Sequence, residues 1–298
     1  MMVKPLSSFS ATSEDEIVIL GICRDLGSSV SSTLKVLEDA FRSFQKIHIR
    51  VVESDSSDDT VRVLNEYRSE NPNFDFDSLG QLEIQISDRW ERIAFCRNRA
   101  AEILKADHRL NECRWVVVAD LDGVNDALTA EAVESCWSRS DWDVCAANQS
   151  APYYDVFALR HPTWSPNDCW RYEEELISVG MNPAIAREKA IYKRQKKISQ
   201  KAEWIPVNSA FGGLAIYKRN YFVMGRYVGH TSDGFRTCEH VPFHENLEEA
   251  GARIFINPAL INCGWNEHNF QHLPFNYFKR QMKLILIRLG LSGILKIS

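Results

Sequence analysis

The chain has 298 residues, of which 45% are hydrophobic and 25% charged, the composition of a folded globular protein. Its formal net charge of -5 argues against a general nucleic-acid binder, because contacts to phosphates favour a basic surface. The length allows a substantial core, either in one large α/β domain or in two smaller ones.

Cysteines and apolar segments bear on the compartment of the protein. The eight cysteines are scattered, form no CxxC pair and partly lie inside apolar runs, which is typical of buried thiols in a reducing compartment. Residues 1–14, which we expect to be flexible, lack the apolar core of a secretory signal. No segment reaches the ~18 uninterrupted apolar residues of a membrane span. We therefore expect a cytoplasmic protein, with the cytoplasmic face of a membrane as an alternative.

The first half of the chain alternates apolar runs with segments of helical periodicity. The expected strands are 17–25, the start of 47–60, 82–87 and 115–122, and the expected helices are 31–44, 60–68 and 92–104. This order predicts an α/β fold with a Rossmann-like, mostly parallel central sheet, right-handed crossovers and helices on both faces.

The last of these strands, in WVVVADLDG (115–123), ends in two aspartates. A continuous valine run is typical of a strand covered on both faces, and such sheets bind ligands beyond the carboxyl ends of their strands. Asp120 and Asp122 therefore lie where chemistry is expected. Carboxylates this close repel each other unless a proton, a cation or hydrogen bonds compensate, so a divalent metal is the first candidate. Gly123 then allows a sharp turn.

The second half has a different pattern, in which short strands, loops and helices are mixed. We expect short strands at 142–149 and 153–160, a turn-rich loop at 162–168, and a basic segment at 187–201 that forms a solvated helix face. Further along, we expect a glycine pair leading into a strand in 207–219, a loop feeding a helix closed by Gly251 in 238–251, and a strand at 252–262. This pattern predicts a mixed sheet built onto the first half.

Four motifs in order resemble the GT-A fold of nucleotide-sugar glycosyltransferases. VVESDSSDDT resembles the second-strand motif that meets the nucleoside, and RIAFCRNRA resembles the arginine and asparagine helix beside the donor. DLD follows the fourth strand, and CEHVPFHENLEEAG resembles the acidic loop and helix that face the acceptor. The combination is also similar to the fungal capsule-associated mannosyltransferases, although those usually have a less regular acidic motif.

The resemblance implies a domain organisation and an activity. It implies a single GT-A domain over 15–272, with a nucleotide-sugar-binding half at 15–125 and an acceptor half at 126–272. Residues 273–298 would form an amphipathic, cationic tail that packs on the core, forms a homodimer contact or lies on a membrane. The activity would be transfer of a hexose, with mannose as one choice, from a GDP- or UDP-linked sugar to a hydroxyl of a glycan or lipid-linked acceptor, with Mn²⁺ or Mg²⁺ as cofactor.

The same resemblance implies roles for individual residues. For the donor, we expect contacts from Arg24, Glu53, Asp55, Arg92, Arg97, Asn98 and Asp120. For the metal we expect Asp120, Asp122 and His268, and for the acceptor sugar Asp155, Arg160, Gly212 and Gly213. The expected catalytic residues are Asp122 and Glu239, the latter as general base if the enzyme inverts. Surface salt bridges, helix caps and a β-bulge are the structural alternatives for these residues.

Two other interpretations of the DLDG strand remain open. VVVADLDGV also resembles the haloacid-dehalogenase superfamily, in which Asp120 would be the nucleophile and Asp122 the acid/base of a phosphatase or phosphotransferase. That family carries this strand near the start of its domain and supplies a later acidic pair, features that this sequence does not share. The third interpretation is a non-catalytic α/β module that binds a metal or carbohydrate.

Overall fold

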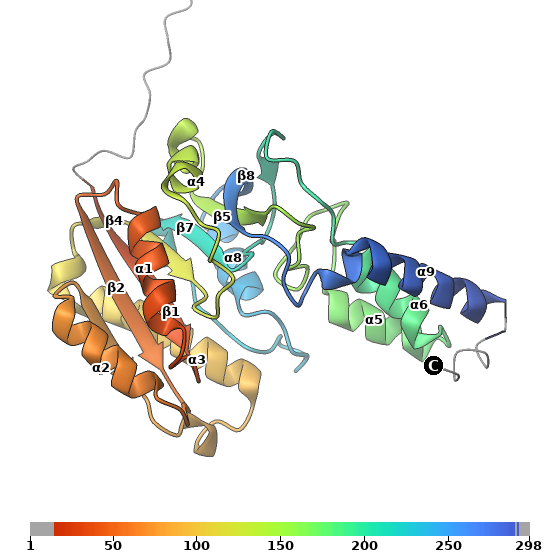
Figure 1. Ribbon diagram of the computed structural model, residues 1–298, viewed down its shortest axis with the longest axis horizontal. Helices are drawn as coiled ribbons and strands as arrows, with labels where there is room; N and C mark the ends of the chain where they lie inside the picture. The colour runs from red at the N-terminus through yellow and green to blue at the C-terminus, as the bar shows by residue number, and fades with distance from the viewer. Residues whose placement is uncertain (1–14, 290, 292–298) are drawn as a thin grey trace, which may run out of the picture.

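Alternating strands and helices in the first half of the chain build the parallel part of one large sheet (Figure 1). The computed structural model describes residues 15–289 and 291. The sheet has the strand order β3-β2-β1-β4-β7-β5-β8-β6. The first four of these strands are parallel, β7 is antiparallel between β4 and β5, and β8 pairs in parallel with β5. The mixed α/β architecture expected from the sequence is confirmed, and the strands of the second half extend the same sheet.

The element bounds follow the apolar runs of the sequence. The strands are β1 (Glu16–Cys23), β2 (Lys46–Glu53), β3 (Phe74–Ser78), β4 (Cys113–Ala119), β5 (Val144–Gln149), β6 (Ile205–Pro206), β7 (Leu214–Lys218) and β8 (Ile254–Cys263). The α-helices are α1 (Val30–Ala40), α2 (Thr60–Glu70), α3 (Arg89–Ala106), α4 (Ala130–Glu134), α5 (Cys169–Ser178), α6 (Pro183–Arg187), α7 (Arg219–Phe222), α8 (His240–Glu249) and α9 (Pro274–Arg288). Short 3-10 turns are η1 (Leu82–Ile84), η2 (His108–Leu110), η3 (Ser135–Ser138) and η5 (Phe270–His272), and η4 (Glu188–Tyr192) is a π-helical turn.

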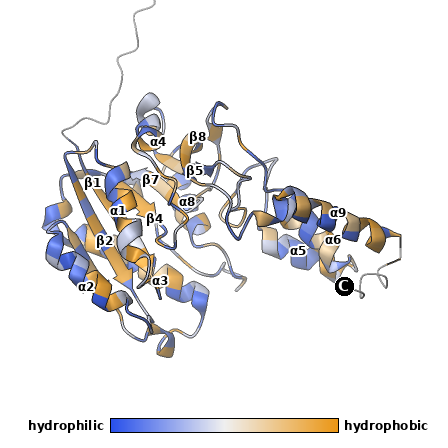
Figure 2. Cartoon of the chain, viewed as in Figure 1, coloured by the Kyte–Doolittle hydropathy of each residue, from blue (hydrophilic) through white to orange (hydrophobic). Residues whose placement is uncertain are grey.

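Side-chain alternation along the central strands divides the core into two layers. On β1, Ile17 and Ile19 belong to the layer with α1, α2 and α4, whereas Val18 and Leu20 belong to the layer with α3, α7 and α8. All four are at most 2% exposed, because a central parallel strand is covered on both faces. In Figure 2 the strands of the first half of the chain, on the left of the view, are mostly hydrophobic.

Two expected strands were wrong. Residues 82–84 form a 3-10 turn, and the third strand is instead β3, where Phe74 and Phe76 are buried and the intervening aspartate is more exposed. The alternation in β3 spans only five residues, so the longer apolar pattern of 82–87 was the stronger strand signal in the sequence. Residues 153–160 form turns, from which the buried Tyr153 packs against Trp164 at 5.6 Å between ring centroids.

A helical lobe made of α5, α6, η4 and α9 extends from the sheet (Figure 1). The basic segment 187–201 is not a solvated helix face throughout, since Arg194 is 6% exposed and donates to Ser165 Oγ at 2.9 Å. Arg280 of α9 forms an ion pair with Glu188 at 2.9 Å, which fastens α9 to η4. The flexible segment expected at 1–14 and the end of the tail lie outside the described residues. Among the helices described, none has both the length and the hydropathy to cross a membrane.

The turn before β7 predicts a steric requirement for glycine. Gly213 has φ +86°, and a Cβ there would lie 2.6 Å from Val124 Cγ2 and 2.8 Å from the Tyr154 hydroxyl. Gly213→Ala should therefore lower the free energy of unfolding by about 2–5 kcal/mol, combining left-handed backbone strain with overpacking. Urea denaturation measures this change.

Gly234→Ala is the matched control, because Gly234 has φ +80° and nothing within 4 Å of the added Cβ. It should cost only the backbone strain of about 1–2 kcal/mol. Equal losses in the two variants would contradict the close packing around Gly213.

Candidate active site

A cleft of about 790 Å³ opens at the carboxyl ends of β1, β2 and β4. The ends of these strands contribute Arg24, Asp55, Asp120 and Asp122 to its lining. The start of α3, residues 154–157, the segment before α8 and residues 267–271 complete the wall, together with parts of the helical lobe. This is the edge at which parallel α/β sheets bind ligands.

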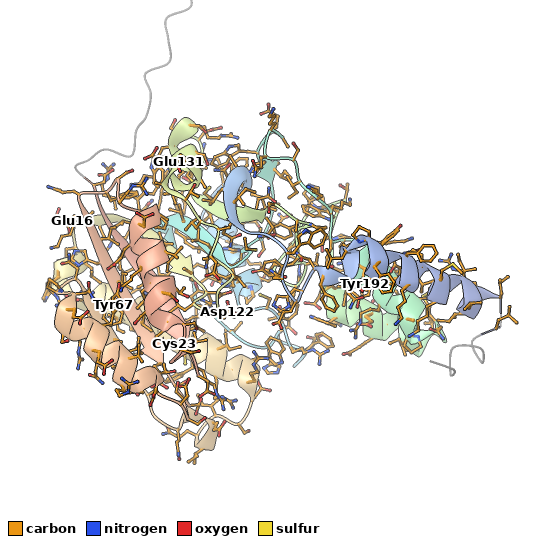
Figure 3. All side chains as sticks on the ribbon, viewed as in Figure 1. Glu16, Cys23, Tyr67, Asp122, Glu131 and Tyr192 are labelled. Atoms are coloured by element: carbon orange, nitrogen blue, oxygen red, sulfur yellow. The ribbon has the colours of Figure 1, made fainter. Side chains whose placement is uncertain are left out.

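The DLDG turn presents its two aspartates on either side of a buried anchor. Leu121 is 1% exposed and packs in the core with α1, whereas Asp120 and Asp122 both line the cleft. The backbone N–H of Asp120 donates to the Gly213 carbonyl at 2.9 Å, which ties the turn to the segment before β7. Asp122 is exposed, and in the view of Figure 3 it lies between the first-half strands and the helical lobe.

One arginine joins the end of β4 to the start of α8. Arg97 is 6% exposed, and its Nη2 donates to Asp120 Oδ1 at 2.7 Å while its Nε donates to Glu239 Oε1 at 2.7 Å. The guanidinium also lies 5.2 Å from the centroid of the Phe211 ring. From the sequence we expected Arg97 to contact the diphosphate of the donor. In the structure two protein carboxylates take these donors, because a buried guanidinium needs fixed partners.

The carboxylates of this cluster are electrostatically coupled. Burial, with a smaller contribution from the negative charge of Asp122, raises the pKa of Asp120 to about 7, although the positive charge of Arg97 opposes this rise. The Asp120 side chain is 29% exposed, and this exposed part faces the cleft. The cluster therefore holds three carboxyl groups, Asp120, Asp122 and Glu239, beside the single arginine that contacts two of them, which favours binding of an added cation.

The residues at the cleft fit a hard divalent cation in their chemistry. Asp122 and Asp120 offer carboxylate oxygens, which Mg²⁺ and Mn²⁺ prefer, and His268 lines the same cleft. His268 stacks on Tyr154 at 5.3 Å between ring centroids and lies 3.6 Å from Glu267. Asp120, Asp122 and His268 do not bring their ligand atoms within 4.8 Å of one another, so all three can bind one ion only if a side chain moves.

Within the part of the chain described, one group of three metal-ligand residues does meet that distance. It consists of Glu16, His48 and Cys113. Glu16 and Cys113 begin β1 and β4, so this group lies at the opposite end of the strands from the cleft. It is separate from the candidate active site.

Comparisons with known proteins bear on the fold. No family model and no curated protein sequence matches the chain. Among solved structures, S. aureus TarS 1-349 superposes with a TM-score of 0.50 at 14% identity, covering 91% of this chain and 64% of that one. That neighbour has the GT-A type of sheet. The chain has a GT-A fold.

Other solved chains are similar at lower scores. The mannosyltransferase PcManGT from Pyrobaculum calidifontis, in complex with GDP-Man and Mn²⁺, has a TM-score of 0.49 at 14% identity, covering 95% of this chain and 66% of that one. GalNAc-T7 with UDP, GalNAc and Mn²⁺ has a TM-score of 0.45 at 13% identity, covering 83% of this chain and 43% of that one. The chain thus spans less than two thirds of the length of these three solved chains.

Of the two acidic residues after β2 that we expected at the donor, Asp55 and not Glu53 reaches the cleft. Glu53 is 1% exposed, accepts a hydrogen bond from the Ser56 N–H at 3.0 Å and another from the Ser78 hydroxyl, so it supports the loop instead of facing a nucleoside. Asp55 lines the cleft at φ +60° and accepts from the Glu83 N–H at 2.8 Å. The left-handed residue turns the chain toward the cleft after β2.

The other residues expected to contact the donor divide between cleft and interior. Arg92 lines the cleft with its Nε 3.5 Å from Asp55, and Arg24 lines it from the end of β1. Asn98 does not reach the cleft. Its side chain exchanges two hydrogen bonds with the Tyr227 backbone, at 2.8 and 3.0 Å, because it lies on the face of α3 that packs against that segment.

Of the four residues expected at the acceptor sugar, one lines the cleft. Asp155 accepts from the N–H groups of Gly212 at 2.8 Å and Ala158 at 3.2 Å, and burial raises its pKa. Arg160 lies outside the cleft lining and pairs with Asp168 at 2.8 Å. Gly212 and Gly213 do not line the cleft, because protein atoms fill the space beside both glycines.

The sequence analysis missed several residues of the cleft. Aromatic side chains of Trp90, Phe157, Trp170 and Tyr192 line it, the last two from the helical lobe. His240 also lines it, stacked on Phe211 at 3.7 Å between ring centroids, and burial holds its pKa well below the ordinary value. Its place next to Glu239 was the available signal. The aromatic residues had none, because core and cleft aromatics look alike in sequence.

The raised pKa of Asp120 predicts how stability depends on pH. Between its ordinary pKa of 3.8 and about 7, the folded protein keeps a proton that the unfolded chain has released. The free energy of unfolding contributed by Asp120 therefore falls as pH rises through this window. Asp120→Asn should flatten that part of the curve, measured by thermal melting between about pH 4 and pH 8.

Asp122→Asn provides the comparison, since it removes a charge that raises the pKa of Asp120. It should move the sloping part of the curve to lower pH without abolishing it. Identical curves for wild type and both variants would contradict the coupling of the two aspartates.

Proposed function

We propose that the protein is a metal-dependent glycosyltransferase that moves a hexose from a nucleoside-diphosphate sugar to a carbohydrate hydroxyl. The observation that carries this proposal is the pair Asp120 and Asp122 at the end of β4, opening into a cleft of about 790 Å³ in a GT-A fold. The cleft mixes acidic, arginine and aromatic side chains, which suit a cation, a diphosphate and a sugar ring.

Donor binding involves both signs of charge. Asp122 and Asp120 would hold Mn²⁺ or Mg²⁺, and His268 from the segment after β8 would become the third ligand by moving toward them when the ion binds. The bound cation would neutralise the departing diphosphate. Arg92 and Arg24 line the same cleft and would contact the diphosphate, while Asp55 would accept hydrogen bonds from the nucleoside. A GDP-linked mannose is the finer expectation, and only the sequence resemblance carries it; a UDP-linked hexose is its alternative.

Acceptor activation would fall to Glu239. Its carboxylate lines the cleft, 7% exposed, and the Arg97 donor on Oε1 fixes its orientation. In an inverting transfer Glu239 would take the proton of the acceptor hydroxyl as the new bond forms. Arg97 acts through Glu239 and Asp120 and is a positioning residue. The acceptor would be a glycan or a lipid-linked carbohydrate.

The competing interpretations have less support. A haloacid-dehalogenase-type phosphatase needs Asp120 as a free nucleophile, whereas Asp120 Oδ1 accepts from Arg97 at 2.7 Å, and the GT-A fold is a different arrangement of strands. A non-catalytic carbohydrate- or metal-binding module would bind the same ligands without turnover. Incubation with nucleotide-sugars, with and without acceptors, separates the three.

Asp122 should be essential for donor binding and turnover. In a thermal-shift screen, nucleoside diphosphates and their sugars should stabilise the wild type only with Mn²⁺ or Mg²⁺, by about 2.7 kcal/mol at a hundredfold excess over Kd. Asp122→Ala should lose this stabilisation and at least about 100-fold in turnover, since it removes a cation ligand at the developing charge.

Asp126→Ala is the matched control for this loss. Asp126 is an exposed aspartate of the same turn that does not line the cleft, so its loss should leave donor binding intact. Normal metal-dependent turnover in Asp122→Ala, with both variants melting like the wild type, would sink the proposed function.

Glu239→Gln tests the general base. It keeps the shape of the side chain and removes the carboxylate, so an inverting enzyme should lose about 10²- to 10⁴-fold in kcat with donor binding preserved. Glu245→Gln, on the exposed side of the same helix α8, should leave kcat unchanged. Product stereochemistry is read by NMR, and an unchanged kcat with an inverted product would eliminate Glu239 as the base.

A further inference from the structure

Exposed apolar side chains are concentrated in one segment of the helical lobe. Of the fourteen large hydrophobic residues that are exposed in the described part of the chain, seven lie within residues 275–291. They are Phe275, Tyr277, Phe278, Met282, Ile285, Leu289 and Leu291. A folded protein leaves single apolar residues on its surface, but a cluster of this kind marks an interaction site.

Five of these residues form a stripe along α9. Phe275, Phe278, Met282, Ile285 and Leu289 follow the helical spacing 3-4-3-4, which confines them to about 80° of the helix circumference at 100° per residue. The opposite side of α9 faces the lobe, where Leu284 is 3% exposed and Arg280 pairs with Glu188. The stripe (these five residues) therefore points away from the protein. Figure 2 shows hydrophobic and hydrophilic residues alternating along this helix.

The charged residues in the chain segment that carries the stripe are all positive. From residue 268 to the end, the chain carries five lysines or arginines and no aspartate or glutamate, although its overall net charge is -5. Lys279 and Lys283 lie on one flank of the stripe and Arg288 on the other, all three exposed. Within residues 15–289 and 291 none of the three takes part in an ion pair.

We propose that α9 lies on an anionic membrane surface, with the stripe among the lipid acyl chains and its flanking cations at the headgroups. An apolar stripe between basic residues is the pattern of helices that bind in the plane of a membrane interface. A second copy of the chain fits this face less well, because a symmetric contact would bring the lysines beside the stripe together with those of the partner. An anionic lipid surface satisfies the apolar and the charged parts at once.

The position of α9 relative to the cleft gives this docking a consequence for the acceptor. Phe270 and Gln271 of η5 line the cleft, and α9 begins at Pro274. Tyr192, which is labelled in Figure 3, lines the cleft from the same lobe that α9 packs on. A membrane-bound α9 would hold the cleft close to the headgroups, where a lipid-linked carbohydrate presents its hydroxyl. This consequence rests on the proposed function, whereas the docking of α9 does not.

Vesicle sedimentation tests the docking without donor, acceptor or metal. The wild-type protein should bind phosphatidylcholine vesicles that contain about 30 mol% phosphatidylserine at least about tenfold more tightly than pure phosphatidylcholine vesicles, and salt should weaken the binding. Lys279→Gln/Lys283→Gln should weaken it by about 30-fold, as each cation near the surface contributes about fivefold. Lys35→Gln/Lys105→Gln removes two exposed lysines of the sheet domain and should have little effect.

A second pair of variants tests the apolar part. Phe278→Ser/Ile285→Ser should abolish binding, whereas Ile84→Ser/Met224→Ser, which removes two exposed apolar residues elsewhere, should not. All four variants change exposed side chains and should melt like the wild type. Absent binding by the wild type, or binding that survives both α9 variants, would overturn the proposal. So would a dimer in sedimentation velocity that Phe278→Ser/Ile285→Ser disperses, because the stripe would then belong to a second copy.

Failure here is distinguishable from failure of the proposed function. Loss of vesicle binding with intact metal-dependent nucleotide binding would remove the membrane and leave the transferase. The reverse result would leave a membrane-binding helix on a protein of another activity.

Discussion

The charge balance around Arg97 is the constraint on which the centre of this protein depends. Asp120 and Glu239 come from segments far apart in the chain and would repel each other in a partly buried site. Arg97 donates to both at 2.7 Å, so the end of β4, the helix α3 and the start of α8 are held in one arrangement. Removing one partner of such a cluster leaves buried charge without compensation, which is why the three residues act as a unit.

This unit balances only part of the negative charge. Asp122 stands outside the Arg97 contacts, and burial together with its neighbouring charge raises the pKa of Asp120 to about 7. A site that holds a proton so readily also attracts a divalent cation, and the cleft beside it has room for a nucleotide and a sugar. The negative charge that Arg97 leaves unbalanced therefore affects both the stability of the folded chain and the cation binding that we propose for it.

Much of the fold was predictable from local patterns. The valine run before Asp120, the isoleucine run of β1 and the glycines before β7 each have a strong local signature, and the strands that they predict lie in the sheet as expected. The errors came from segments whose neighbours decide their conformation. The pattern of residues 82–87 predicts a strand, but the strand that pairs with β2 is β3, which contains Phe74 and Phe76. Residues 153–160 form turns whose side chains are partly buried, because they pack against and hydrogen-bond with loops distant in the sequence, such as the one that contains Ser209.

The sequence by itself determined which strands are central and where acidic residues leave the sheet, because period-two and continuous apolar patterns depend only on nearby residues. Which of those acidic residues reach the cleft was decided by tertiary structure alone. Glu53 turns inward to Ser78 across the β2–β3 pair while Asp55 reaches the cleft, and Arg97 meets Glu239 across 142 positions of sequence. Side-chain direction and charge pairing at such distances follow from packing, which no local pattern encodes.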